Sequence, residues 1–137
     1  MNLKENSEIN PRSLSEAYLN SYYIYSDVMD IILKLRKKYK TGLLSNLTPE
    51  MRNRIKEKHD LERYFDAEVF SCDADVAAMK PDLKPYEVIS RKLEVFMDQC
   101  LFIDNSLKNI DTAKRLGMKT ILFSDKEIFL KDIADFL

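Results

Sequence analysis

The chain has 137 residues, which is enough for one compact domain and too few for two ordinary ones. Hydrophobic residues make up 45% and charged residues 33%, a balance typical of a folded globular protein and not of a disordered one. The net charge of −1 provides no broad positive field, so neither nucleic acid nor an acidic membrane is an expected partner.

The sequence shows no signal for export or for a membrane span. Residues 1–12 are polar, and no stretch approaches the roughly 18 apolar residues that a spanning helix needs. The two cysteines, Cys72 and Cys100, form no C-x-x-C or other metal-ligand spacing, which fits a reducing compartment. We therefore expect a cytoplasmic protein.

The first half of the chain alternates helical and extended patterns. Residues 14–25 have the spacing of a short helix, although Tyr22 to Tyr25 could also be extended. Three further elements follow in chain order: a helix over 27–38 that Ser26 can cap, a buried strand over 41–44 that ends at Ser45-Asn46, and a helix over 48–58 with Thr48 as cap and Pro49 in its first turn.

The second half continues the alternation. In chain order we expect a strand over 67–71, a loop over 72–80, a helix over 83–93, a buried strand over 101–103 that ends at Asp104, a helix that Ser106 can cap and Gly117 stops, a strand over 119–123 and a last amphipathic segment. Strands that alternate with helices predict a parallel sheet covered on both faces.

Polar residues follow the carboxyl ends of three expected strands. Ser45 and Asp104 come directly after their strands, and Lys80 ends the loop that follows another. Because the carboxyl ends of parallel strands meet at one edge of the sheet, we expect these three side chains to converge there.

The motifs that contain these residues resemble those of the haloacid dehalogenase-like (HAD) hydrolase superfamily. Leu43-Leu44-Ser45-Asn46 is similar to its second motif, Met79-Lys80-Pro81-Asp82 to its third, and Leu101-Phe102-Ile103-Asp104-Asn105-Ser106 to its fourth. The resemblance covers residues from about Asp27 to Phe123. It implies a three-layer, Rossmann-like α/β core with a parallel sheet, over residues 27–137, and leaves 1–26 as an N-terminal segment that could be a cap remnant.

The resemblance also implies roles for individual residues. Ser45, Asn46 and Lys80 would bind the phosphoryl group, since phosphoryl transfer spreads negative charge over three oxygens and needs cations and fixed donors. Asp104 and Asn105 would hold Mg²⁺, for which a carboxylate oxygen is a suitable ligand. Many relatives have a second acid where this chain has Asn105, so we expect Mg²⁺ binding to be weak or absent.

The family's first motif, Asp-x-Asp at the end of a strand, is missing. Its first Asp attacks phosphorus and its second is the general acid and base. Asp27 and Asp30 lie three apart on an expected helix and cannot replace it. Asp73-Ala74-Asp75 has the right spacing, but it comes after the second motif and belongs to the loop before Lys80. The resemblance therefore implies no catalytic nucleophile and little of the cap.

In this family the missing strand lies between the strands that end in Ser45 and Asp104. Its absence would leave two strand pairs with buried, unpaired backbone groups, which costs about 1–3 kcal/mol for each group. Four ways of closing the gap remain open: the segment Tyr22 to Tyr25, direct pairing of the two strands, a strand from another copy, or a complementing fragment.

We interpret the chain as a HAD-like hydrolase of the Mg²⁺-dependent phosphatase type, acting on a small phosphorylated metabolite, truncated or split and inactive alone. The alternative is a non-catalytic interaction module or subunit that keeps the HAD fold. A gene remnant without function is a third possibility.

Overall fold

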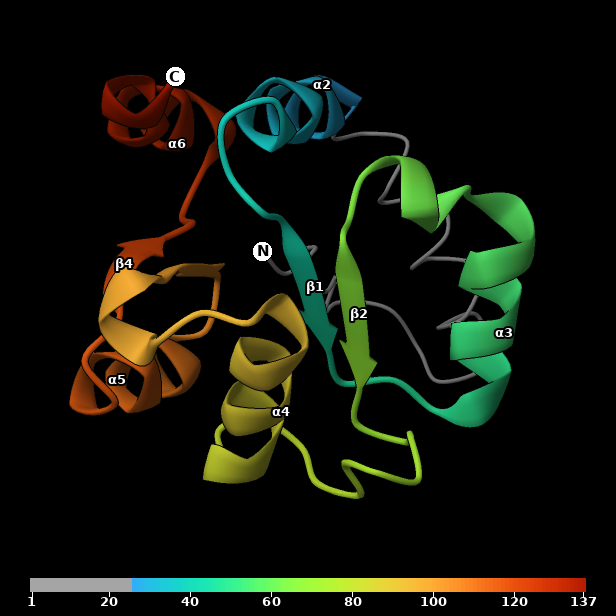
Figure 1. Cartoon of the computed structure of the whole chain (residues 1–137). Helices are drawn as coiled ribbons and strands as arrows, with labels where there is room; N and C mark the ends of the chain where they lie inside the picture. The colour runs from blue at the N-terminus through green and yellow to red at the C-terminus, as the bar shows by residue number, and fades with distance from the viewer. Residues whose placement is uncertain (1–25) are drawn as a thin grey trace.

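The computed structural model describes residues 26–137, and Figure 1 shows the course of the chain. The expected helix over 14–25, the segment Tyr22 to Tyr25 and most of the N-terminal segment 1–26 lie outside the described residues. The described helices are α2 (Ser26–Arg36), α3 (Pro49–Lys58), α4 (Leu83–Leu93), α5 (Leu107–Arg115) and α6 (Lys126–Ile133). The strands are β1 (Gly42–Ser45), β2 (Ala67–Phe70), β3 (Leu101–Asp104) and β4 (Lys119–Leu122).

Local signals explain where several elements begin and end. The Thr48 hydroxyl accepts a hydrogen bond from the Met51 N–H at 3.3 Å, so it caps α3 as expected. Gly117 follows α5 with a φ of +93°, a conformation that suits glycine at a helix end. Ser106 stands at the N-cap position of α5, but the prediction that its side chain caps the helix is wrong. The side chain makes no cap hydrogen bond, and the Ser106 backbone N–H donates to Asp104.

The four strands form two separate pairs. β1 pairs with β2 in parallel, with Leu44 opposite Val69, and β3 pairs with β4 in parallel, with Ile103 opposite Ile121. Direct pairing of the strands that end in Ser45 and Asp104, one of the four ways of closing the gap, is therefore wrong, because β1 and β3 are not hydrogen-bonded neighbours.

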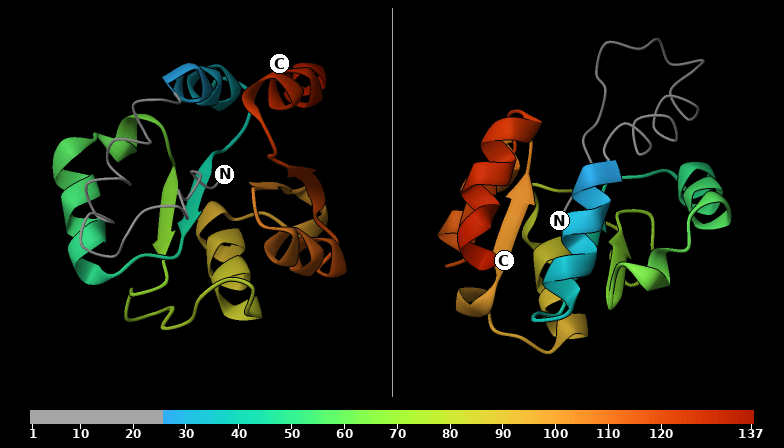
Figure 2. Two further views of the ribbon diagram at one scale, coloured as in Figure 1. Left: turned by 180° about the vertical axis from the view of Figure 1, so that it is seen from behind. Right: turned by 90° about the horizontal axis from the view of Figure 1, so that it is seen from above.

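Helices on both faces hold the two strand pairs in one three-layer α/β domain (Figure 2). On one face, α4 packs on β1 and β2, and α5 packs on β3 and β4. The opposite face is covered by α2, α3 and α6, whose buried side chains form one apolar cluster with Leu43 of β1 and Ile103 of β3. The second cluster likewise joins both pairs, through Leu44 and Phe102. None of the helices in residues 26–137 has the length and apolar composition needed to span a membrane.

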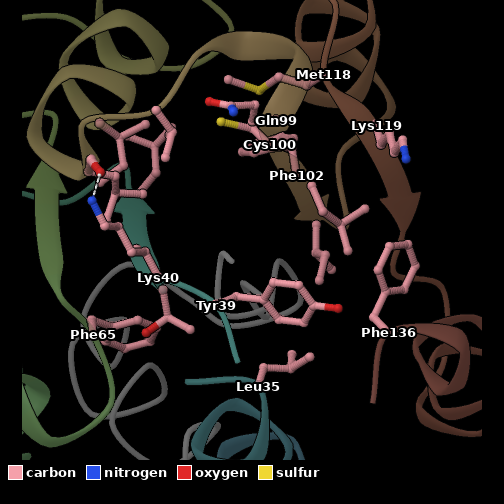
Figure 3. Close-up of a pocket in the computed structure, with 18 of the residues that line it drawn as sticks. Leu35, Tyr39, Lys40, Phe65, Gln99, Cys100, Phe102, Met118, Lys119 and Phe136 are labelled. Carbon is pink, nitrogen blue, oxygen red and sulfur yellow. Dashed lines mark hydrogen bonds between the residues drawn. The ribbon is translucent and has the colours of Figure 1, made fainter. Parts of the chain in front are cut away.

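A cavity of about 690 Å³ lies between β1 and β3. Gly42 and Leu44 line one side of it, and Leu101, Phe102 and Ile103 line the other. Figure 3 shows Tyr39, Phe102 and Phe136 among the side chains around this space. The place where the sequence predicts a missing strand is thus a cavity bounded by the described residues.

Candidate functional site

Lys80 is held in place by Asn46, the residue that follows β1. The Asn46 Oδ1 accepts a hydrogen bond from the Lys80 N–H at 2.9 Å, and its Nδ2 donates to the Lys80 carbonyl at 3.1 Å. The side-chain amide therefore pairs with the backbone of Lys80 as a neighbouring strand would. Asn46, expected to bind phosphate, here fixes the position of the lysine.

The Lys80 ammonium group joins the carboxyl ends of β1 and β3. Its Nζ lies 2.8 Å from the Asp104 Oδ2 and donates a second hydrogen bond to the Leu44 carbonyl at 3.0 Å. It also lies 5.9 Å from the centre of the Phe102 ring. The side chains of Lys80 and Asp104 are both fully buried, so this ion pair is shielded from solvent.

Asp104 accepts two further hydrogen bonds. Its Oδ2 also accepts from the Asn109 Nδ2 at 3.1 Å, and its Oδ1 accepts from the Ser106 N–H at 2.9 Å. Burial raises the pKa of Asp104, but the Lys80 charge and the hydrogen bonds lower it by more than burial raises it. The pKa of Asp104 therefore lies below its ordinary value. Asp104 is therefore ionised at neutral pH.

Tyr86 extends this buried network into α4. Its hydroxyl donates to the Asn109 backbone carbonyl at 2.9 Å, and its ring lies 5.2 Å from the Phe102 ring. Burial raises the pKa of Tyr86, so the phenol stays protonated and remains a donor. Asn109 thus links the helix start of α5 to both Tyr86 and Asp104.

The other two predicted site residues lie nearby but are not joined to the pair. Ser45 is buried and its backbone carbonyl accepts from the Ser71 N–H at 3.0 Å. Asn105 follows Asp104 directly and is half-buried. Among the hydrogen bonds of the described residues, none connects the Ser45 hydroxyl or the Asn105 amide to Lys80 or Asp104.

The described residues do not fit a magnesium site. No group of three His, Cys, Asp or Glu side chains in residues 26–137 is placed to hold a metal ion. Among residues 26–137, Asp104 is the one acid at the centre, and both of its oxygens already accept hydrogen bonds. Mg²⁺ prefers oxygen ligands with near-ideal octahedral geometry, which one occupied carboxylate does not supply.

The Asp73-x-Asp75 pair has structural partners instead of a catalytic arrangement. Asp73 accepts from the Phe70 N–H at 2.9 Å and from Arg52 at 3.0 Å, which closes the turn after β2. Asp75 is largely exposed and forms an ion pair with Lys92 at 3.4 Å. These contacts support the assignment of both residues to the loop before Lys80.

Two groups at the site, the Leu44 carbonyl and the Asn109 amide, were not among the predicted site residues. The Leu44 carbonyl is a backbone acceptor, and a sequence contains no signal for which carbonyl a distant lysine will reach. Asn109 lies near the start of α5, and its side-chain amide donates to the Asp104 carboxylate five residues earlier.

The fold and this site define a three-layer α/β domain with a buried lysine–aspartate pair at the carboxyl ends of two parallel strands. The family model of haloacid dehalogenase-like hydrolases matches residues 6–117. The chain therefore belongs to the haloacid dehalogenase-like hydrolase family.

Solved structures of this family share the fold. A predicted HAD-like hydrolase from Porphyromonas gingivalis is 24% identical with a TM-score of 0.73, over 93% of this chain and 65% of that one. A HAD family enzyme from Bacteroides thetaiotaomicron, crystallised with magnesium and inorganic phosphate, is 22% identical with a TM-score of 0.66, over 90% and 66%. L-2-haloacid dehalogenase from Xanthobacter autotrophicus is 20% identical with a TM-score of 0.60, over 93% and 53%.

One curated protein is similar over a shorter segment. Drimenol cyclase drtB from Aspergillus calidoustus is 31% identical over 52 residues, which cover 38% of this chain and 10% of that protein. This match spans about a tenth of the length of drimenol cyclase. The chain spans about two thirds of the length of the Porphyromonas and Bacteroides proteins.

Proposed function

We propose that this chain provides the phosphoryl-binding part of a phosphatase-type hydrolase core, acting on a small phosphorylated metabolite. One observation carries the proposal: a fully buried ammonium group lies 2.8 Å from a buried carboxylate where two parallel strands end. Enclosing a lysine is expensive, and lysines with buried charge are frequent at functional sites.

Lys80 is suited to this role because it is a point charge with several donors. A phosphoryl oxygen would replace the Leu44 carbonyl as acceptor, while Asp104 keeps the ammonium in place. Ser45 lies at the end of β1 and would add a hydroxyl donor. The fixed donors then stabilise charge that develops on the phosphoryl oxygens.

The same residues supply no nucleophile, so the chain alone binds a phosphate ester without hydrolysing it. Asp104 is held by Lys80, Asn109 and Ser106, and the only Asp-x-Asp in the sequence is engaged in a loop. General acid–base assistance typically increases the rate by about 10²–10⁴-fold. The chain lacks this assistance and also lacks the nucleophile that would form a covalent intermediate. Magnesium, which is present in a crystal structure of the Bacteroides enzyme, is expected to bind here weakly or not at all.

The test combines binding with turnover. Inorganic phosphate is titrated into the purified chain with and without Mg²⁺, and its binding is followed by ³¹P line broadening. Hydrolysis of p-nitrophenyl phosphate is measured under the same conditions. We expect binding that Lys80→Met abolishes and Lys84→Met, an exposed lysine of α4, leaves unchanged, together with no turnover. Turnover that Asp73→Asn or Asp75→Asn removes would overturn the assignment of the loop.

The second candidate function is a non-catalytic interaction module. The observation that favours it is the complete burial of the Lys80–Asp104 pair. A fully buried pair would also suit a purely structural role, in which it links the two strand pairs. Absence of phosphate binding in the folded wild-type chain would favour this alternative.

A further inference from the structure

We propose that Tyr86 of α4 is a positioning residue of the phosphoryl-binding site. It acts on the Lys80 ammonium group through Asn109 and Asp104, because three hydrogen bonds in series connect the tyrosine hydroxyl to the lysine. Since this assigns a further residue to the phosphoryl-binding site, it rests on the proposed function. The affinity of the site for a phosphoryl group then depends on a side chain of α4 that does not contact the phosphoryl group itself.

The Tyr86 hydroxyl lies in the core, where a phenol needs a hydrogen-bond partner. Tyr86 is fully buried, and its hydroxyl donates to the Asn109 backbone carbonyl at 2.9 Å. Its ring lies 5.2 Å from the Phe102 ring, centre to centre. A phenylalanine would make the same ring contact without burying a polar group, so packing alone does not account for a tyrosine at this position. What the hydroxyl adds is a fixed position for Asn109.

Asn109 transmits this constraint to Asp104. Asn109 is itself buried in the first turn of α5. Its backbone carbonyl accepts from Tyr86, and its side-chain Nδ2 donates to the Asp104 Oδ2 at 3.1 Å. The backbone and the side chain of one residue are thus held by two different elements, α4 and β3. A shift of the Asn109 backbone would therefore move its amide relative to the Asp104 carboxylate.

The Asp104 Oδ2 is the atom that Asn109 and Lys80 share. It accepts from the Asn109 Nδ2 at 3.1 Å and from the Lys80 Nζ at 2.8 Å. A carboxylate oxygen that accepts from two fixed donors is oriented by both, so the Asn109 amide helps to set where the ammonium group lies. In the proposed function, Lys80 exchanges the Leu44 carbonyl for a phosphoryl oxygen while Asp104 keeps the ammonium in place. The position of Oδ2 then determines how well the lysine points at the phosphoryl group.

These contacts close a ring that begins and ends at Lys80. The chain runs from Lys80 into α4 and reaches Tyr86 after six residues. From the Tyr86 hydroxyl, hydrogen bonds lead through Asn109 and Asp104 back to the ammonium group. The Phe102 ring contacts the Tyr86 ring and lies 5.9 Å from the Lys80 Nζ. Members of a closed, buried network support one another, so removing the hydroxyl opens the ring and loosens Lys80 without changing the lysine, its carboxylate or the aromatic contact.

The experiment compares Tyr86→Phe with Tyr64→Phe in the full chain. Tyr64→Phe is a matched control because it also removes one hydroxyl, and the Tyr64 ring packs beside Phe65 in the other apolar cluster. Inorganic phosphate is titrated into each variant, and its binding is followed by ³¹P line broadening. We expect Tyr86→Phe to weaken phosphate binding by about three- to tenfold, which corresponds to the loss of one internal hydrogen bond, and Tyr64→Phe to leave it unchanged.

Two further measurements distinguish positioning from a purely structural role. The Lys80 ammonium and the Asn109 side-chain amide are followed by ¹H–¹⁵N NMR without phosphate, and both signals should shift in Tyr86→Phe but not in Tyr64→Phe. Asn109→Ala removes the side-chain link to Asp104 but keeps the backbone carbonyl that accepts from Tyr86. In this background Tyr86→Phe should leave phosphate affinity unchanged, because the path is already broken. If Asn109→Ala does not fold or does not bind phosphate, the NMR shifts decide.

Three results would overturn the proposal. The first is an unchanged phosphate affinity in Tyr86→Phe. The second is an equal loss of affinity with Asn109 and with alanine at that position, which would make the hydroxyl a structural contact only. The third is a Lys80 ammonium signal that does not shift in Tyr86→Phe. Absence of phosphate binding in the wild-type chain, together with the expected NMR shifts, would refute only the proposed function.

Discussion

Replacing Lys80 by methionine should destabilise the domain strongly. The substitution keeps most of the side-chain volume but removes the cation and its hydrogen bonds to Asp104 and to the Leu44 carbonyl. It leaves a fully buried carboxylate without its counter-charge. Breaking a buried ion pair from one side costs about 3–5 kcal/mol, which is a large part of the 5–15 kcal/mol that typically stabilises a domain.

A double-mutant cycle separates this coupling from simple loss of packing. Lys80→Met, Asp104→Asn and the double variant are compared by urea unfolding, followed by circular dichroism at pH 7. Asp104→Asn also leaves an uncompensated buried charge, so each single change should cost several kcal/mol. The double variant contains neither charge, and it should be less destabilised than the sum of the two by about 1–3 kcal/mol.

The pH dependence provides a second check with a defined sign. The pKa of Asp104 is lowered in the folded wild-type protein, because the effects of Lys80 and the hydrogen bonds exceed that of burial. Its stabilising contribution is therefore present above the unfolded pKa and is lost as the pH falls through the folded value. In Lys80→Met burial dominates and the pKa rises, so this variant should recover part of its stability as the carboxyl becomes protonated. Additive effects at pH 7 within about 0.5 kcal/mol, or a variant that only loses stability in acid, would refute the reasoning.

Three other substitutions test local parts of the structure. Asn46→Ala removes both hydrogen bonds to the Lys80 backbone and should cost about 1–3 kcal/mol in urea unfolding, with Asn53→Ala on α3 as a control near zero. Gly117→Ala places a side chain at a φ of +93° and should lower stability by about 1–2 kcal/mol, measured by thermal unfolding. Glu68→Gln should increase stability at pH 7, and the gain should vanish in acid. Burial raises the pKa of Glu68, so its charged form opposes folding above that pKa.

The secondary structure could largely be predicted because its signals are local. The helix expected over 83–93 is α4 (Leu83–Leu93), and the cap and proline at Thr48-Pro49 mark the start of α3. The helix expected to continue to Lys38 ends at Arg36, since the spacing of apolar residues does not fix the last turn of a helix. These successes depend on interactions within a few residues of sequence.

The relation between the strand pairs could be predicted only as a set of alternatives. Whether β1 and β3 pair depends on how the helices on both faces space them, and no pattern within either strand encodes that distance. The convergence of Lys80 and Asp104 followed from strand ends meeting at one edge, and the two atoms lie 2.8 Å apart. The assignment of Asn46 to a phosphate group was made without knowing that its amide would be engaged by the Lys80 backbone.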